Sequence, residues 1–189
     1  MKEKIIKRIF EGLIGISFFI SLVGTFMRFG FFVRERMGVF GLAFIICIAS
    51  IPLLTVKKYR RLYIYASMLL PVIILFGFIG YKTIYFEFGA VFLVFSSVYL
   101  LGLILLGIKK SSCFIVLFYN CIFLLICVNT RFLLQHHAMS KDNLVNIVKK
   151  CIGQFGGYAM PGYFVINFGL VCAALLSLIL IFLRRKQIK

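Results

Sequence analysis

Hydrophobic residues fill most of the chain, and short polar segments divide them into six stretches. The stretches cover about residues 9–27, 39–56, 62–80, 88–108, 113–130 and 163–183. Each approaches the length of about 20 apolar residues that an α-helix needs to cross the hydrocarbon core of a bilayer. The pattern predicts an all-α membrane protein, a bundle of about six transmembrane helices with one interfacial amphipathic helix, in a single domain over residues 1–189.

Composition and charge agree with a membrane protein. Of the 189 residues, 63% are hydrophobic, whereas soluble domains are about half apolar. The net charge is +17, but Lys and Arg cluster between the apolar stretches, where they set topology and attract anionic lipid. We therefore expect membrane lipid as a partner, and no nucleic acid.

The distribution of positive charge predicts how the chain is oriented. Fourteen of the 22 Lys and Arg residues lie on the side that holds both termini, and eight lie on the other side. Positive residues collect on the cytoplasmic side of a membrane. We expect a multi-pass protein of the cytoplasmic (inner) membrane with both termini inside. The first stretch is expected to stay in the mature protein, since no small-residue cleavage site follows it.

The longest polar segment, residues 131–162, is predicted to be a loop on the outer side. Ser140 is a candidate helix N-cap, and apolar residues at spacings of three and four indicate a short amphipathic helix over residues 141–152. Gly153 follows as a C-terminal stop. A helix of this length and polarity is expected to lie on the membrane surface.

The histidines and cysteines do not form a metal-binding pattern. His136 and His137 are adjacent, so on a helix their side chains point about 100° apart and do not converge on one ion. The six cysteines show no CxxC spacing, and most fall in apolar stretches, where a free cysteine behaves as a small hydrophobic residue. We predict no metal site.

Small and acidic residues in the first apolar stretch predict how it packs. Gly12, Gly15 and Gly24 would allow neighbouring helices to approach closely. Glu11 lies near the inner end of this stretch, next to basic residues. We expect Glu11 to be an interfacial carboxylate, which the dipole of the helix N-terminus tolerates.

Two short motifs point to a family. Glu35 and Arg36 precede the second apolar stretch, and a Phe-x-Gly-x-x-Met-Pro segment, residues 155–161, leads into the last one. In these motifs the chain resembles the disulfide-bond-formation protein B (DsbB) family, bacterial membrane enzymes that oxidise thiols with a quinone. The resemblance implies a quinone cofactor beside Arg36 and Glu35. It also implies a thiol–disulfide exchange partner on the outer side.

The chain departs from this family at its cysteines. The family's CxxC pair falls on Phe29 and Phe32 here, and the family has four spans rather than six. Disulfide transfer needs an attacking thiolate and a resolving partner. Cys151 and Cys127 are therefore the candidate catalytic residues. A redox-inactive relative that binds quinone or lipid at Arg36 is the alternative within the family.

Two other classes of protein fit the pattern. A small six-span solute-binding or transport subunit would have this size and topology. A structural subunit of a larger membrane complex would use Gly12, Gly15, Asn120 and Asn167 as packing contacts. Whether the chain is an enzyme, and on which substrate, stays open from the sequence.

Overall fold

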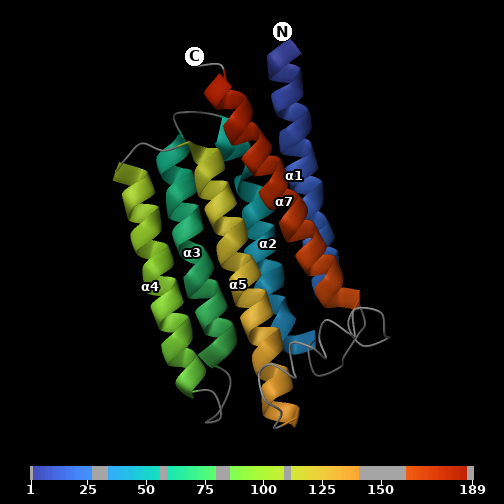
Figure 1. Ribbon diagram of the computed structural model, residues 1–189, viewed down its shortest axis with the longest axis vertical. Coiled ribbons are helices and arrows are strands. Elements are labelled where there is room, and N and C mark those ends of the chain that lie inside the picture. Colours follow the sequence, from blue (N-terminus) through green and yellow to red (C-terminus); the bar gives the residue numbers. More distant parts are fainter. Residues whose placement is uncertain are drawn as a thin grey trace.

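The apolar stretches fold into helices in the computed structural model (Figure 1). The structure describes residues 2–26, 34–55, 59–79, 86–108, 112–140 and 161–186, except for the side chains of some residues near the helix ends. Over these ranges the chain forms no strand. Its helices are α1 (Lys2–Phe26), α2 (Arg34–Thr55), α3 (Arg60–Ile79), α4 (Phe86–Ile108), α5 (Cys113–Ser140) and α7 (Pro161–Lys186).

The predicted all-helical bundle is confirmed for these described ranges. Each of the six apolar stretches lies in one helix, to within one or two residues at its ends. Three helices contain segments that are long and apolar enough to cross a membrane: Arg8–Thr25, Cys113–Thr130 and Gly162–Leu183. Shorter apolar segments lie in the other helices: Phe40–Leu54 in α2, Arg61–Ile74 in α3 and Phe92–Ile108 in α4.

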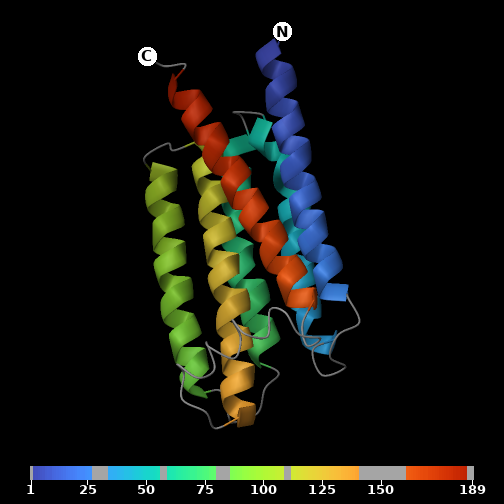
Figure 2. The ribbon, with the colours of Figure 1, turned by 45° about the vertical axis from the view of Figure 1, so that its right-hand side comes forward.

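The helices run up and down beside one another. Both termini lie at one end of the bundle, and α1 and α7 lie side by side at one edge while α4 forms the opposite edge (Figures 1 and 2). The ends of α2 and α4 lie at the end that holds the termini (Figure 1). Adjacent helices are therefore antiparallel, as the predicted order of inner and outer connections requires.

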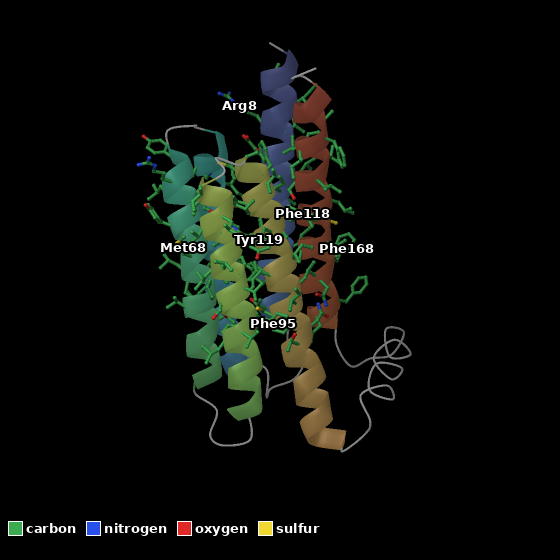
Figure 3. The ribbon with its side chains drawn as sticks, turned by 60° about the vertical axis from the view of Figure 1, so that its left-hand side comes forward. Arg8, Met68, Phe95, Phe118, Tyr119 and Phe168 are labelled. Atoms are coloured by element: carbon green, nitrogen blue, oxygen red, sulfur yellow. The ribbon has the colours of Figure 1, made fainter. Side chains whose placement is uncertain are left out.

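Large apolar side chains point outward all around the bundle. On α4, Val94, Val98 and Ile108 are exposed, Ile108 to 72%, and Phe168 on α7 points away from its neighbours (Figure 3). Contiguous apolar surface on this scale is rare on soluble monomers. Such a surface is compatible with a membrane protein.

Small residues bring α1 and α7 into close contact. A Cβ atom on Gly169 would collide with Ser21 Oγ and the Ser17 carbonyl oxygen, and one on Gly24 would lie 2.8 Å from Ile166 Cγ1. Ser21 Oγ also donates to the Ile166 carbonyl oxygen across the interface, at 3.0 Å. The expectation of close packing is confirmed at Gly24, and it is wrong at Gly12, where an added Cβ would meet open space.

The predicted outer loop is shorter than expected at both ends. Helix α5 continues to Ser140, so His136 and His137 lie in its last turns and Ser140 is its last residue. The hydropathy pattern ended the stretch at residue 130, but Arg, Leu, Gln, Ala and Met beyond it are good helix formers and can continue the helix. The predicted surface helix over residues 141–152 and Gly153 lie outside the described residues.

Glu11 is buried within the bundle. Only 6% of its surface is exposed. It is spaced three and seven residues before Ile14 and Phe18, which are both fully buried, so the helical repeat puts all three on one face. Since α1 packs against both α2 and α7, this face is covered. The sequence did not reveal that coverage.

Candidate functional site

The predicted quinone site begins at the first turn of α2. Glu35 and Arg36 are the second and third residues of this helix. The turn lies at the end of the bundle opposite the termini, where α7 also begins at Pro161 (Figures 1 and 2). Two motif segments 125 residues apart therefore start helices at the same end of the molecule. The side chains of Glu35 and Arg36 lie outside the described part.

Of the two candidate catalytic cysteines, the structure describes only Cys127. Cys127 is a free thiol with 3% of its surface exposed. Because α5 continues to Ser140, Cys127 lies about 20 Å from the end of this helix at 1.5 Å per residue. It is therefore in the middle of the helix, yet only three residues before the end of the apolar spanning segment at Thr130, so its expected place near the outer end of the span is not contradicted. Cys151 lies outside the described residues.

A buried hydrogen-bond network joins α3, α4 and α5. At its centre is Asn120 of α5, with 2% of its surface exposed. Its amide nitrogen donates to Ser67 Oγ at 2.8 Å and to the Tyr63 hydroxyl at 3.3 Å, both on α3. Its carbonyl oxygen accepts from the Tyr99 hydroxyl of α4 at 2.7 Å. One side chain thus ties three helices together, and we call these four residues the Asn120 network.

Proline explains where the network forms on α3. Pro71 lies inside α3 and has no N–H to offer the carbonyl four residues earlier, which is that of Ser67. The Tyr99 hydroxyl lies 3.2 Å from this carbonyl oxygen and donates to it. Such freed carbonyls in apolar surroundings need a donor from a neighbouring helix. Tyr99 therefore replaces the hydrogen bond that Pro71 cannot donate within α3.

Aromatic rings fill the space between α4 and α5. The Tyr99 ring stacks on Phe123 with centroids 3.9 Å apart and on Tyr119 with centroids 5.2 Å apart. Tyr119 lies over Gly102 of α4, where an added Cβ would collide with its ring. Its hydroxyl donates to the Val98 carbonyl oxygen at 3.3 Å. Figure 3 shows Tyr119 at the junction of the two helices.

Ser96 is an exception among the buried serine and threonine hydroxyls. Each of the others donates to a backbone carbonyl three or four residues earlier in its own helix: Ser17, Ser21, Thr25, Ser50, Ser67 and Ser177. This is the usual way for Ser and Thr to satisfy themselves inside a helix. The Ser96 hydroxyl is buried and makes no hydrogen bond within the described part of the chain. It lies one turn before Tyr99, on the same buried face of α4.

A second polar contact joins α5 to α7. The amide nitrogen of Asn129 donates to Asn167 Oδ1 at 2.9 Å, and the amide nitrogen of Asn167 donates to Asn129 Oδ1 at 3.1 Å. Asn167 and Asn120, which sequence reasoning singled out as packing contacts, therefore bond within this chain. Gly15 also contacts a neighbour inside the chain, since its added Cβ would lie 3.2 Å from Ile51 Cδ1 of α2.

The Asn120 network consists of amide, hydroxyl and phenol groups. It contains no carboxylate, imidazole or lysine, so its members exchange hydrogen bonds without a general base of ordinary pKa. Such a set suits helix–helix attachment or recognition of an uncharged polar group. Sequence reasoning missed Tyr63, Ser67 and Tyr99, although a serine four residues before a proline inside an apolar stretch is a usable signal.

No metal-binding group of three or more His, Cys, Asp or Glu residues occurs within the described ranges. His136 and His137 lie at positions of α5 whose side chains are not described. The expectation that the protein binds no metal therefore stays a prediction.

Comparison with known proteins adds no relative. No protein-family model, no curated protein and no solved structure matches the chain. The resemblance to the DsbB family consequently rests on the two motif segments alone.

Proposed function

We propose that this chain is an integral membrane protein that crosses the cytoplasmic membrane six times. Support comes from three helices of membrane-spanning length and composition and from the apolar side chains that face outward on the others, α4 above all. A protein with this surface would aggregate in water, whereas lipid chains match it. The backbone supports the proposal too, since helices satisfy their own hydrogen bonds in a bilayer.

Alkaline carbonate extraction of membranes tests this step. The protein stays in the membrane pellet if it is integral. Release of the full chain into the supernatant would contradict the proposal, because peripheral proteins held by charge dissociate under these conditions. The extraction is needed because the strongly basic clusters would also attach a peripheral protein to anionic lipid.

At the outer end of this bundle we propose a quinone-binding site of the DsbB type, with Arg36 beside the quinone and Glu35 next to it. The supporting observation is that α2 begins at Arg34 and α7 at Pro161 at the same end of the bundle. These are the positions at which the two motif segments open their helices. An arginine donates from a planar guanidinium, which suits a quinone carbonyl oxygen.

The position of Cys127 favours a redox-inactive relative over an oxidase. Thiol–disulfide exchange requires a thiolate to reach a disulfide sulfur. The side chain of Cys127 has only 3% of its surface exposed, so neighbouring side chains cover its thiol in the folded bundle. The proposed protein therefore binds a quinone, or the head group of a lipid, without passing electrons to it from a Cys127–Cys151 pair.

Quinone content of the purified protein tests this site. We expect protein purified in mild detergent to retain quinone, measured by extraction and chromatography, and Arg36→Ala to lose most of it. Arg61→Ala is the matched control, because Arg61 is exposed near the start of α3, at the other end of the bundle. Equal quinone content in the wild type and Arg36→Ala would overturn the proposal.

One observation favours a solute-binding or transport subunit as the second candidate. The Asn120 network places uncharged hydrogen-bonding groups in the middle of an apolar bundle. Polar groups at that depth commonly mark a site or pathway for a polar molecule. The two candidates differ experimentally, since this one predicts no dependence of ligand binding on Arg36.

A further inference from the structure

Tyr99 makes polar contacts that join α4 to both α3 and α5, and the Val98 carbonyl oxygen adds one more to α5 by accepting from Tyr119. The single proton of the Tyr99 hydroxyl is shared between Asn120 Oδ1 of α5, at 2.7 Å, and the Ser67 carbonyl oxygen of α3, at 3.2 Å. Around this point, aromatic rings rather than close backbone contact separate α4 from α5. Helix α4 is also the edge of the bundle in both ribbon views (Figures 1 and 2). It is therefore the helix that can move away from the bundle with the smallest loss of contacts to its neighbours.

Moving α4 outward would leave two hydrogen-bond acceptors unsatisfied. Asn120 Oδ1 and the Ser67 carbonyl oxygen would both lose their donor, and in apolar surroundings such loss is costly. Pro71 denies the Ser67 carbonyl a helical N–H as a substitute. A molecule that enters between α4 and the other two helices must therefore bring a hydrogen-bond donor.

Ser96, in contrast, is a hydrogen-bond donor that lacks an acceptor. Its buried hydroxyl makes no hydrogen bond in the closed bundle, as far as the described residues show. It lies one turn from Tyr99, about 4.5 Å along the helix axis. A buried donor without an acceptor is unusual and calls for a physical reason. An acceptor brought by an entering molecule would satisfy it.

We propose that α4 is a lateral gate latched by Tyr99, and that the junction of α3, α4 and α5 binds a lipid-soluble alcohol from the bilayer. A hydroxyl head group can act as both donor and acceptor. Its proton replaces that of Tyr99 at Asn120 or Ser67, and its oxygen accepts from Ser96. An acyl or alkyl tail stays in the lipid beside α4 and α5. The inference rests on the proposed membrane insertion, but it is independent of the quinone site.

Tryptophan fluorescence can report the opening of α4, because the chain contains no tryptophan. Phe123→Trp places the reporter under Tyr99, at a position with 4% exposure. Brominated phospholipid quenches a tryptophan that touches lipid. With Tyr99→Phe added, we expect about a tenfold larger open population, equivalent to about 1.4 kcal/mol, and stronger quenching of this reporter.

Matched controls separate the latch from general loosening. Tyr119→Phe also removes a hydroxyl that links α5 to α4, through the exposed bond to the Val98 carbonyl. It leaves Asn120 and Ser67 with their donor, so it should leave quenching unchanged. Leu101→Trp on the exposed face of α4 should be quenched in every variant. Absence of quenching at residue 101 would refute membrane insertion itself. Quenching at residue 101 with no effect of Tyr99→Phe at residue 123 would refute the latch alone.

The ligand class is tested with two brominated lipids in vesicles of phosphatidylcholine. Brominated dioleoylglycerol has a free hydroxyl, and brominated trioleoylglycerol has none. We expect the first to quench the reporter at residue 123 more strongly than the second, and Ser96→Ala to reduce that difference. Equal quenching by the two lipids, or a difference that persists unchanged in Ser96→Ala, would overturn the proposed alcohol site.

Discussion

Asn129 of α5 and Asn167 of α7 exchange two amide hydrogen bonds, each side chain donating to the other. Asn129 makes a further bond from its amide nitrogen to the Leu125 carbonyl oxygen, at 2.8 Å. The two residues therefore differ in what they would leave behind. Loss of Asn167 leaves Asn129 with a partner in its own helix, whereas loss of Asn129 leaves both polar atoms of the Asn167 amide without this contact.

We predict an asymmetry between the two leucine variants. Asn129→Leu should lower the free energy of unfolding by more than Asn167→Leu, with both costs about 1 kcal/mol, as interhelical hydrogen bonds in membranes are worth. The double variant should cost less than the sum, because no unpaired amide remains. Denaturation by SDS followed by far-UV circular dichroism measures these values. Strict additivity would show that the amides do not interact in the bilayer.

The contact between α1 and α7 gives a prediction that opposes helix propensity. Alanine is about 1 kcal/mol better than glycine in a helix interior. Gly169→Ala should nevertheless destabilise the bundle by about 1–3 kcal/mol, the usual cost of overpacking, because its Cβ would meet Ser21 Oγ and the Ser17 backbone. Gly12→Ala is the control, since its Cβ meets nothing, and it should be neutral or stabilising. Similar shifts in both variants would argue against this interface.

Pro71 and Tyr99 should be energetically coupled. Tyr99→Phe leaves the Ser67 carbonyl oxygen without its donor, and Pro71→Ala restores a helical N–H for that same oxygen. We expect Tyr99→Phe to cost less in the Pro71→Ala background than in the wild type. A double-mutant cycle on unfolding free energies measures the difference. An unchanged cost would mean that the Ser67 carbonyl does not depend on Tyr99.

The thiol of Cys127 should be inaccessible in the folded protein. It is buried and lies in the middle of α5. In intact cells, a membrane-impermeant maleimide should leave Cys127 unmodified, and prior reduction should not change the pattern. Addition of SDS should make it reactive. A modification of Cys127 that appears only after reduction would indicate a disulfide and would restore the oxidase hypothesis.

The sequence predicted the helices well because the apolar side chains that raise mean hydropathy are the same ones that make a helix soluble in lipid. The predicted helix end was wrong where a helix continues beyond its apolar residues. Helix α5 runs ten residues past the predicted end at Thr130, since hydrogen bonding and helix propensity continue through Gln135 and Ala138. A helix does not have to end where the membrane does.

The candidate site was harder to predict than the helices. Arg36 and Cys127 were found by motif and residue type, but depth within the bundle is set by packing, and packing put Cys127 well inside. Asn120 was recognised as polar within an apolar stretch. Its partners Tyr63 and Tyr99 were not, because contacts between three helices depend on rotation of each helix about its axis, which one sequence does not specify.

The six-span topology is the central claim, and reporter fusions at three connections test it most directly. Fusions after Lys82, Lys110 and Gly153 would carry alkaline phosphatase, which is active only outside the cytoplasm. The proposed topology predicts activity after Lys82 and Gly153 and none after Lys110, where the chain turns between α4 and α5. Phosphatase activity after Lys110, or its absence after Gly153, would contradict the account.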